Sequence, residues 1–177
     1  MAVHGVSIAV PEPWGSQLQQ HREDVGDPMA RAIPPHITLM PPTEVSATEL
    51  PDFTRHLETV VQAHGPFTVR LRGTGTFRPV SPVVFVQVSQ GIPMCEQLEQ
   101  AVRRGPVTRD LEFPYHPHVT IAHHVPESAL DRAFDQLAGF DARFEVGEIH
   151  LYEHGTDGVW RPVRGFRLSG PRLQPSS

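Results

Sequence analysis

Two short stretches of the sequence place a histidine and a threonine in the same pattern. Residues 35–39 read PHITL and residues 117–121 read PHVTI, which puts His36 and His118 in matching surroundings. Side chains at positions i and i+2 of an extended strand point to one side, and the side chain between them points to the other. Each stretch therefore predicts a strand that presents one imidazole and one hydroxyl together while its aliphatic residues are buried.

These four polar side chains suit the cleavage of a phosphodiester. The unperturbed pKa of histidine is about 6.5, so one imidazole can act as a base while another carries a proton near neutral pH. One of His36 and His118 would activate water or a ribose hydroxyl, and the other would protonate the departing oxygen. The hydroxyls of Thr38 and Thr120 can each donate a hydrogen bond to an anionic oxygen. This chemistry needs no metal.

The surroundings of the motif carry more information than the motif itself. With eleven histidines in the chain, a chance His-x-Thr match is expected, and a third copy occurs at 154–156. That copy lies in a turn with two glycines and has no aliphatic strand to orient it. Only the copies around His36 and His118 combine a preceding proline with flanking aliphatic residues. The prediction of catalysis therefore applies to these two copies alone.

The elements that must position the two motifs repeat in the same order. Matching order and spacing favour a mixed α/β (α+β) fold made of duplicated β-α-β-α-β halves, about residues 1–75 and 80–170, plus a last strand. A pseudo-twofold axis between the halves would make this a bilobal protein with both motifs facing a central cleft. The predicted strands cover residues 3–10, 36–40, 67–73, 83–88, 118–123, 143–153 and 159–168, and the predicted helices cover 14–26, 92–104, 127–139 and a segment capped by Ser46 or Thr48.

Composition indicates a single domain over residues 1–177. No apolar run is long enough to cross a bilayer. No lysine or arginine precedes the first predicted strand, as one would in a signal peptide. The single cysteine, Cys95, cannot form a disulfide within the chain. We therefore expect a cytoplasmic protein. The absence of lysine and asparagine indicates the codon bias of a GC-rich, bacterial genome. The net charge of −5 argues against a broad basic surface that coats nucleic-acid duplexes.

The paired motifs, 36-HITL-39 and 118-HVTI-121, resemble the His-x-Ser/Thr-hydrophobic signature of the 2H phosphoesterase superfamily, which includes RNA 2′-5′ ligases and cyclic phosphodiesterases. The resemblance implies a bilobal fold with a central cleft and metal-independent activity on 2′,3′-cyclic phosphates or 2′-5′ linkages. It makes the two histidines the acid–base pair and the two threonines the phosphate ligands. By analogy with cyclic phosphodiesterases, His118 would activate water and His36 would protonate the leaving oxygen, and ligation would exchange these roles.

One position departs from this resemblance, and several residues near the motifs are candidate substrate contacts. Ligase-like members often carry an arginine shortly after the second motif, where this chain has His123, so a fixed positive group is missing there. His123 is itself a candidate substrate contact. Tyr115 and Phe77 are candidates to stack on a nucleobase. Arg78 and Arg109 are candidate ligands of a phosphate.

The histidines at 116, 118, 123 and 124 also raise the possibility of a metal site. Imidazole is a good zinc ligand, but no cysteine or acidic ligand lies at a familiar metal spacing from them. His116 and His118 would share one face of a strand, whereas the side chain of His123 would point to the opposite face. The sequence therefore predicts neither a metal nor a cofactor.

Three hypotheses follow. The first is a phosphoesterase that hydrolyses a 2′,3′-cyclic phosphate or 2′-5′ phosphodiester of an RNA end or small nucleotide, with reverse 2′-5′ RNA ligation as a further activity. The second is a catalytically inactive module of the same fold that binds a nucleotide or RNA end. The third is a protein whose duplicated halves serve only assembly. For the first, we expect a monomer that needs no protein partner.

Overall fold

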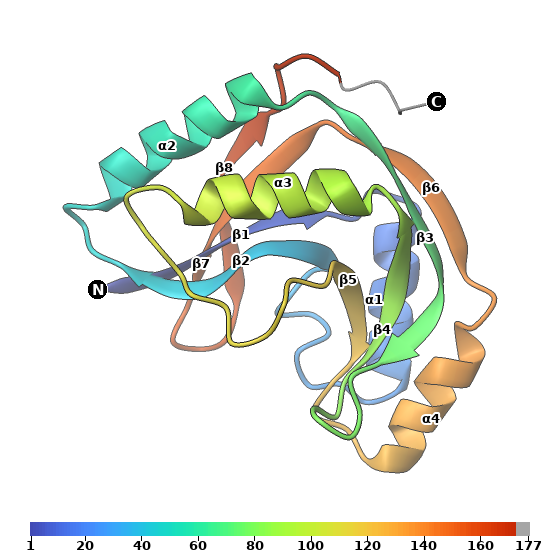
Figure 1. The fold of residues 1–177 in the computed structure, drawn as a ribbon. Helices are drawn as coiled ribbons and strands as arrows, with labels where there is room; N and C mark the ends of the chain where they lie inside the picture. Colours follow the sequence, from blue (N-terminus) through green and yellow to red (C-terminus); the bar gives the residue numbers. More distant parts are fainter. Residues whose placement is uncertain (173–177) are drawn as a thin grey trace.

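The structure is a computed structural model that describes residues 1–172, in which two twisted sheets are flanked by helices (Figure 1). Its strands are β1 (Ala2–Ala9), β2 (His36–Val45), β3 (Phe67–Thr76), β4 (Val84–Gln90), β5 (His118–Ala122), β6 (Asp141–Val146), β7 (Glu148–His154) and β8 (Trp160–Arg167). Its helices are α1 (Trp14–Asp24), α2 (Leu50–Ala63), α3 (Ile92–Arg103) and α4 (Glu127–Gln136). None of these helices is both long enough and apolar enough to cross a lipid bilayer.

Two antiparallel sheets carry the two motifs at equivalent places. Sheet A has the strand order β2-β1-β7-β8, and sheet B has the order β5-β4-β3-β6. The motif strands β2 and β5 are therefore edge strands, each paired with the strand that precedes it in the chain. They also contact each other where the two sheets meet (Figure 1). The predicted α+β fold with two similar halves is confirmed.

The sheets do not follow the predicted division into residues 1–75 and 80–170. β3 leaves the first half to pair with β4 and β6, and β7 and β8 return to complete sheet A beside β1. The strand predicted over 143–153 is two strands, because the chain passes from sheet B to sheet A at Gly147. The alternation of side chains predicts which face of a strand is buried, but it does not predict which strand lies beside it.

The aliphatic residues of both motifs anchor them in the core. Ile37 and Leu39 of β2, and Val119 and Ile121 of β5, are at most 1% exposed, as the alternation predicts. A helix from the other half covers each motif strand, since α1 packs against β5 and α3 packs against β2. The motif strands are therefore fixed by contacts that join the two halves of the chain.

Helix α2 packs beside α3 and against β8 with an apolar stripe. Phe53, Leu57, Val60 and Val61 recur at helical spacing, and all four are buried. The cap position of α2 is Glu49, which has no side-chain cap hydrogen bond, so the predicted cap at Ser46 or Thr48 is wrong. Ser46 instead closes the turn before the helix: its Oγ accepts a hydrogen bond from the Glu49 N–H at 3.1 Å, and its own N–H donates to Glu49 Oε2 at 2.9 Å.

The turn from β4 into α3 depends on Gly91, whose φ is +97° and whose added Cβ would lie 2.7 Å from the carbonyl oxygen of Thr68. Gly26 has a φ of +83° but no atom within 4 Å of an added Cβ. We expect Gly26→Ala to lower the free energy of unfolding by about 1–2 kcal/mol, because only its backbone conformation is unfavourable. Gly91→Ala should lower the free energy of unfolding by ~1–3 kcal/mol more than Gly26→Ala does, because the added Cβ also clashes with the Thr68 carbonyl oxygen. Urea denaturation measures both losses, and equal losses would contradict this account of the turn.

Candidate active site

The same hydrogen bond orients both motif histidines. Nδ1 of His36 lies 2.7 Å from the carbonyl oxygen of Pro34, and Nδ1 of His118 lies 2.7 Å from the carbonyl oxygen of His116. A carbonyl oxygen only accepts, so Nδ1 carries the proton and donates it in both rings. In the neutral ring, Nε2 is then left with its lone pair. Each imidazole therefore offers Nε2 as the nitrogen that can take up or release a proton.

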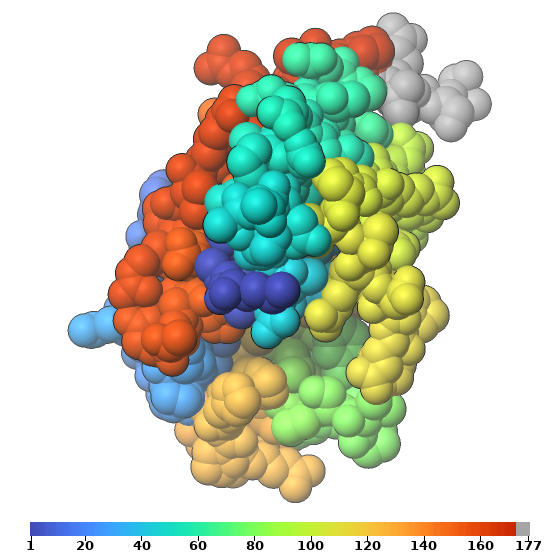
Figure 2. Space-filling model, turned by 90° about the vertical axis from the view of Figure 1, so that its left-hand side faces the viewer, coloured from blue at the N-terminus to red at the C-terminus, as the bar shows by residue number. Residues whose placement is uncertain are grey.

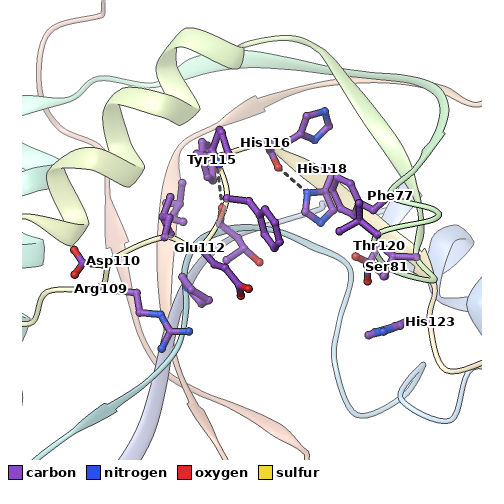
Figure 3. Close-up of a pocket in the computed structure, with 18 residues that line it drawn as sticks. Phe77, Ser81, Arg109, Asp110, Glu112, Tyr115, His116, His118, Thr120 and His123 are labelled. Carbon is purple, nitrogen blue, oxygen red and sulfur yellow. Dashed lines mark hydrogen bonds between the residues drawn. The ribbon is translucent and has the colours of Figure 1, made fainter.

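A cavity of about 680 Å³ opens beside the motif strands. Thr38, His118 and Thr120 line it, together with residues of the segments 77–83 and 109–116 (Figure 3). Seen from the side in Figure 2, a hollow lies between the yellow segment near residue 110 and the green segment near residue 80. Three of the four predicted motif residues are thus brought together around one cavity. No hydrogen bond joins either threonine hydroxyl to another group within residues 1–172, so both remain available to a ligand.

His36, the fourth motif residue, is not one of the residues that line this cavity. It precedes Thr38 by two positions on β2 and shares its face of the strand. Its ring packs against the ring of Trp160 on β8, with 4.5 Å between the ring centroids. A positive charge on His118 contributes to lowering the pKa of His36. The strands that carry the two rings, β2 and β5, contact each other.

Aromatic side chains also surround His118. The ring of Phe77 stands edge-on to it, with a centroid distance of 4.9 Å, and the ring of Phe85 lies at 5.2 Å. Phe77 lines the cavity, as expected for a residue that contacts substrate. Val80 and Phe113 also line the cavity, although they are 74% and 59% exposed. The cavity therefore has a polar end at the second motif, apolar side chains along its wall, and the charged residues Arg109, Asp110 and Glu112 on the side away from His118 (Figure 3).

Tyr115 joins the two motifs directly. Its ring lines the cavity, and its hydroxyl donates a hydrogen bond of 2.7 Å to the backbone carbonyl oxygen of Thr38 (Figure 3). Burial raises the pKa of this hydroxyl above its ordinary value, so it keeps the proton that the bond requires. The structure thus gives Tyr115, a predicted substrate contact, the additional task of holding the first motif strand in place.

His123 lines the cavity at the end of β5 and is connected to α1 through a buried carboxylate. Oδ2 of Asp27 accepts hydrogen bonds from Nε of Arg22 at 2.6 Å and from the backbone N–H of His123 at 3.0 Å. The ring of His123 stacks on that of His124, with 3.8 Å between centroids. His124 has a φ of +60°, which is rare outside glycine and often marks functional segments.

The two arginines predicted as phosphate ligands lie in different places. Nη1 of Arg78 donates to Asp131 Oδ1 at 2.8 Å, and Arg78 is not one of the lining residues. Arg109 lines the cavity at the end far from His118 (Figure 3), where its Nη1 lies 3.5 Å from the carbonyl oxygen of Pro42. Of the two, only Arg109 is placed to meet a ligand in the cavity.

The two motif histidines differ in how readily they accept a proton. Burial lowers the pKa of His36 to about 4, and the positive charges of Arg22 and His118 act in the same direction. Burial also lowers the pKa of His118, with a further contribution from His116. The hydrogen bonds to the backbone carbonyls oppose these effects in both rings. A proton therefore resides more easily on His118 than on His36.

Sequence reasoning missed several residues of the site. Ser81 lines the cavity, Trp160 covers the His36 ring, and the Arg22–Asp27 pair lies behind His123. These residues lie outside both motifs, and their contacts with the motif residues join different elements, so no local pattern marks them. Within residues 1–172, no group of three or more histidine, cysteine or acidic side chains is arranged to hold a metal ion.

We expect proton NMR titration to show Cε1–H of His36 titrating near about 4 and that of His118 below the ordinary 6.5. In His118→Gln, the pKa of His36 should rise, because the neighbouring positive charge is gone. His64→Gln, at the end of α2, should leave it unchanged. An ordinary pKa for His36 in the wild type would contradict the burial of its ring.

The Tyr115 bond predicts a specific loss in Tyr115→Phe. Without the hydroxyl, the backbone carbonyl oxygen of Thr38 loses its hydrogen-bond donor. We therefore expect the free energy of unfolding to fall by about 1 kcal/mol. Tyr152→Phe is the matched control, because no hydrogen bond joins the Tyr152 hydroxyl to another group within residues 1–172. Thermal denaturation of both variants measures the loss of stability. An equal loss in both variants would contradict a stabilising bond between Tyr115 and the first motif strand.

The geometry agrees with comparisons to known proteins. Residues 10–158 match the family model of the 2′-5′ RNA ligase superfamily. The chain is 28% identical over 144 residues to a protein of Bacillus cereus (strain AH820) named "Putative phosphoesterase". The aligned region covers 80% of this chain and 83% of that protein.

Solved structures share the fold over almost the whole chain. The protein TT0787 of Thermus thermophilus superposes with a TM-score of 0.65 at 24% identity, and apo LigT of E. coli superposes with 0.67 at 22% identity. Each covers 95% of this chain and 98% of the other protein. LigT has also been crystallised with 3′-AMP and with phosphate. From the match over residues 10–158 and the two facing His-x-Thr strands, the chain belongs to the 2′-5′ RNA ligase superfamily of 2H phosphoesterases.

Proposed function

We propose that this protein is a metal-independent phosphoesterase that hydrolyses a 2′,3′-cyclic phosphate or 2′-5′ phosphodiester of an RNA end or small nucleotide. The observation that carries the proposal is the matched pair of Nδ1 hydrogen bonds, which leaves Nε2 of His36 and of His118 to exchange protons. Two imidazoles held in the same way on facing strands can supply a base and an acid to one reaction.

The proposed hydrolysis of a cyclic phosphate needs only these groups and water. One Nε2 takes a proton from water as the water oxygen forms a bond to phosphorus. The bond between phosphorus and the 3′ oxygen breaks, and the other Nε2 donates its proton to that oxygen. The product is a 2′-phosphomonoester with a free 3′ hydroxyl. The hydroxyls of Thr38 and Thr120 donate to the non-bridging oxygens as negative charge builds on them.

The different environments of the histidines support one assignment of their roles. His36 has the lower affinity for a proton, so it acts as the base, and His118 acts as the acid. This is the reverse of the assignment that the family resemblance implies. In ligation of a 2′,3′-cyclic phosphate end with a 5′ hydroxyl, the hydroxyl takes the place of water and the 3′ oxygen again leaves. The roles of the two histidines are then the same as in hydrolysis, and they are exchanged only in cleavage of the 2′-5′ linkage.

The cavity supports a nucleotide as the substrate. Its volume of about 680 Å³ is in the range of small-molecule sites. A phosphate at the polar end would place the attached nucleoside along the wall that includes Phe77, Tyr115 and Phe113, where a base can stack on an aromatic ring. The crystal structure of LigT with 3′-AMP supports a nucleotide in this fold.

The first test is turnover of nucleoside 2′,3′-cyclic phosphates in the presence of EDTA. We expect the wild type to be active, and His36→Ala and His118→Ala to lose about 10²–10⁴-fold in rate, because each lacks one proton-transfer group. His154→Ala, in the third copy of the motif, should keep its activity. Binding of a cyclic nucleotide without turnover would instead establish the inactive binding module.

The pH dependence of kcat/KM tests the roles. The base His36 must be neutral, so the rate falls as the pH drops through about 4. The acid His118 must be protonated, so the rate falls as the pH rises through its pKa, which lies below 6.5. We expect a bell-shaped profile with its maximum on the acidic side of neutrality. A rate that is constant across this range would contradict two-histidine chemistry.

A further inference from the structure

The end of helix α1 carries an arginine that the catalytic scheme above does not use. Arg22 lies on the buried face of α1, and only 6% of its side chain is exposed. Its partner Asp27 has a side chain that is 0% exposed. A buried ion pair adds little net stability, because desolvation of the two charges offsets their attraction. The position of this pair therefore calls for a reason other than the stability of the fold.

Asp27 holds the arginine from one side only. Its Oδ2 accepts from Arg22 Nε and from the backbone N–H of His123, and its Oδ1 accepts from the backbone N–H of Met29 at 2.9 Å. The carboxylate is thereby fixed to the loop after α1 and to the end of β5. The guanidinium of Arg22 is consequently fixed with respect to the segment that follows the second motif.

The terminal nitrogens of Arg22 are left without a partner in the protein. Only Nε takes part in a hydrogen bond within residues 1–172, and neither Nη1 nor Nη2 is among the polar atoms of that range that are both unpartnered and sealed from solvent. The small exposed part of the side chain is therefore at its tip. Planar N–H groups of this kind form paired hydrogen bonds with the oxygens of a phosphate.

A shared carboxylate connects Arg22 to the edge of the cavity. Asp27 Oδ2 accepts from Arg22 Nε and from the backbone N–H of His123, which follows β5 and lines the cavity; Arg22 itself is not one of the lining residues. The positive charge of Arg22 contributes to lowering the pKa of both His36 and His123. His36 shares its strand face with Thr38, which also lines the cavity.

We propose that Arg22 is a phosphate-binding residue, held from behind by Asp27, whose terminal nitrogens contact the non-bridging oxygens of the substrate beside His36 and His123. The inference rests on the proposed function, because it names the cation that receives the phosphate of that substrate. Arg22 also opposes protonation of His36, which keeps that imidazole available as a base until the phosphate arrives.

The test measures the affinity for inorganic phosphate and the pKa of His36 by NMR in folded protein. We expect Arg22→Met to weaken phosphate binding by about tenfold to hundredfold and to raise the pKa of His36, since a charge-assisted contact and a nearby positive charge are both lost. Arg31→Met is the matched control, because Arg31 lies in the loop between α1 and β2, is 84% exposed and pairs with Glu23. It should change neither quantity.

Arg22→Lys separates charge from geometry. A lysine keeps the positive charge but lacks the planar pair of donors, so we expect a pKa of His36 close to that of the wild type and a weakened affinity for phosphate. This variant also decides the question if Arg22→Met does not fold. Phosphate affinity equal to the wild type in both variants would overturn the inference.

The two proposals fail in different ways. If the wild type hydrolyses a 2′,3′-cyclic nucleotide but Arg22→Met retains wild-type kcat/KM and phosphate affinity, then the role of Arg22 is refuted and the proposed function stands. If the wild type hydrolyses no cyclic nucleotide, the proposed function is refuted. The phosphate affinity and the pKa of His36 still decide whether Arg22 serves an anion site.

Discussion

The chemistry of this protein depends on a short hydrogen bond that each motif makes with its own backbone. An imidazole without such a bond can exchange its two tautomers and turn about its side-chain torsions. The carbonyl oxygens of Pro34 and His116 remove that freedom from His36 and His118, because they can only accept a hydrogen bond, which Nδ1–H donates. The prolines that precede both motif histidines restrict the same segments of backbone. Strand geometry then places each threonine on the face of its histidine.

Two copies of one motif have acquired different surroundings. The ring of His36 packs against Trp160 and its pKa is lowered in part by the positive charge of Arg22, whereas His118 is bordered by Phe77 and Phe85. A duplicated pair of identical rings has no intrinsic acid or base, so any division of labour must come from what surrounds each ring. The position after the second motif is occupied by His123, and the nearby cation is supplied instead by Arg22 on a helix that precedes the first motif.

The sequence predicts well those features that depend on local periodicity. The faces of both motif strands and the buried stripe of α2 follow from spacings of two to four residues, and the structure has them as predicted. The start of α2 lies later than the predicted cap, because Ser46 closes a turn before the helix. β2 is longer than predicted because an edge strand tolerates Pro41 and Pro42, which cannot donate to a neighbouring strand. The exchange of strands between halves was not predictable in this way. The contact of Trp160 with His36 depends on that exchange, and the bond between Asp27 and His123 depends on the packing of α1 against β5. Local patterns relate neither pair.

The strand order also determines when each sheet can form as the chain is synthesised. All strands of sheet B lie between residues 67 and 146, so that sheet has every partner once β6 has left the ribosome. In sheet A, β1 has only β2 as a neighbour until β7 arrives, more than a hundred residues later. An unpaired strand edge is a template for incorrect pairing, and contacts between such distant segments form slowly. Folding of the nascent protein therefore has its most vulnerable period before the last two strands emerge.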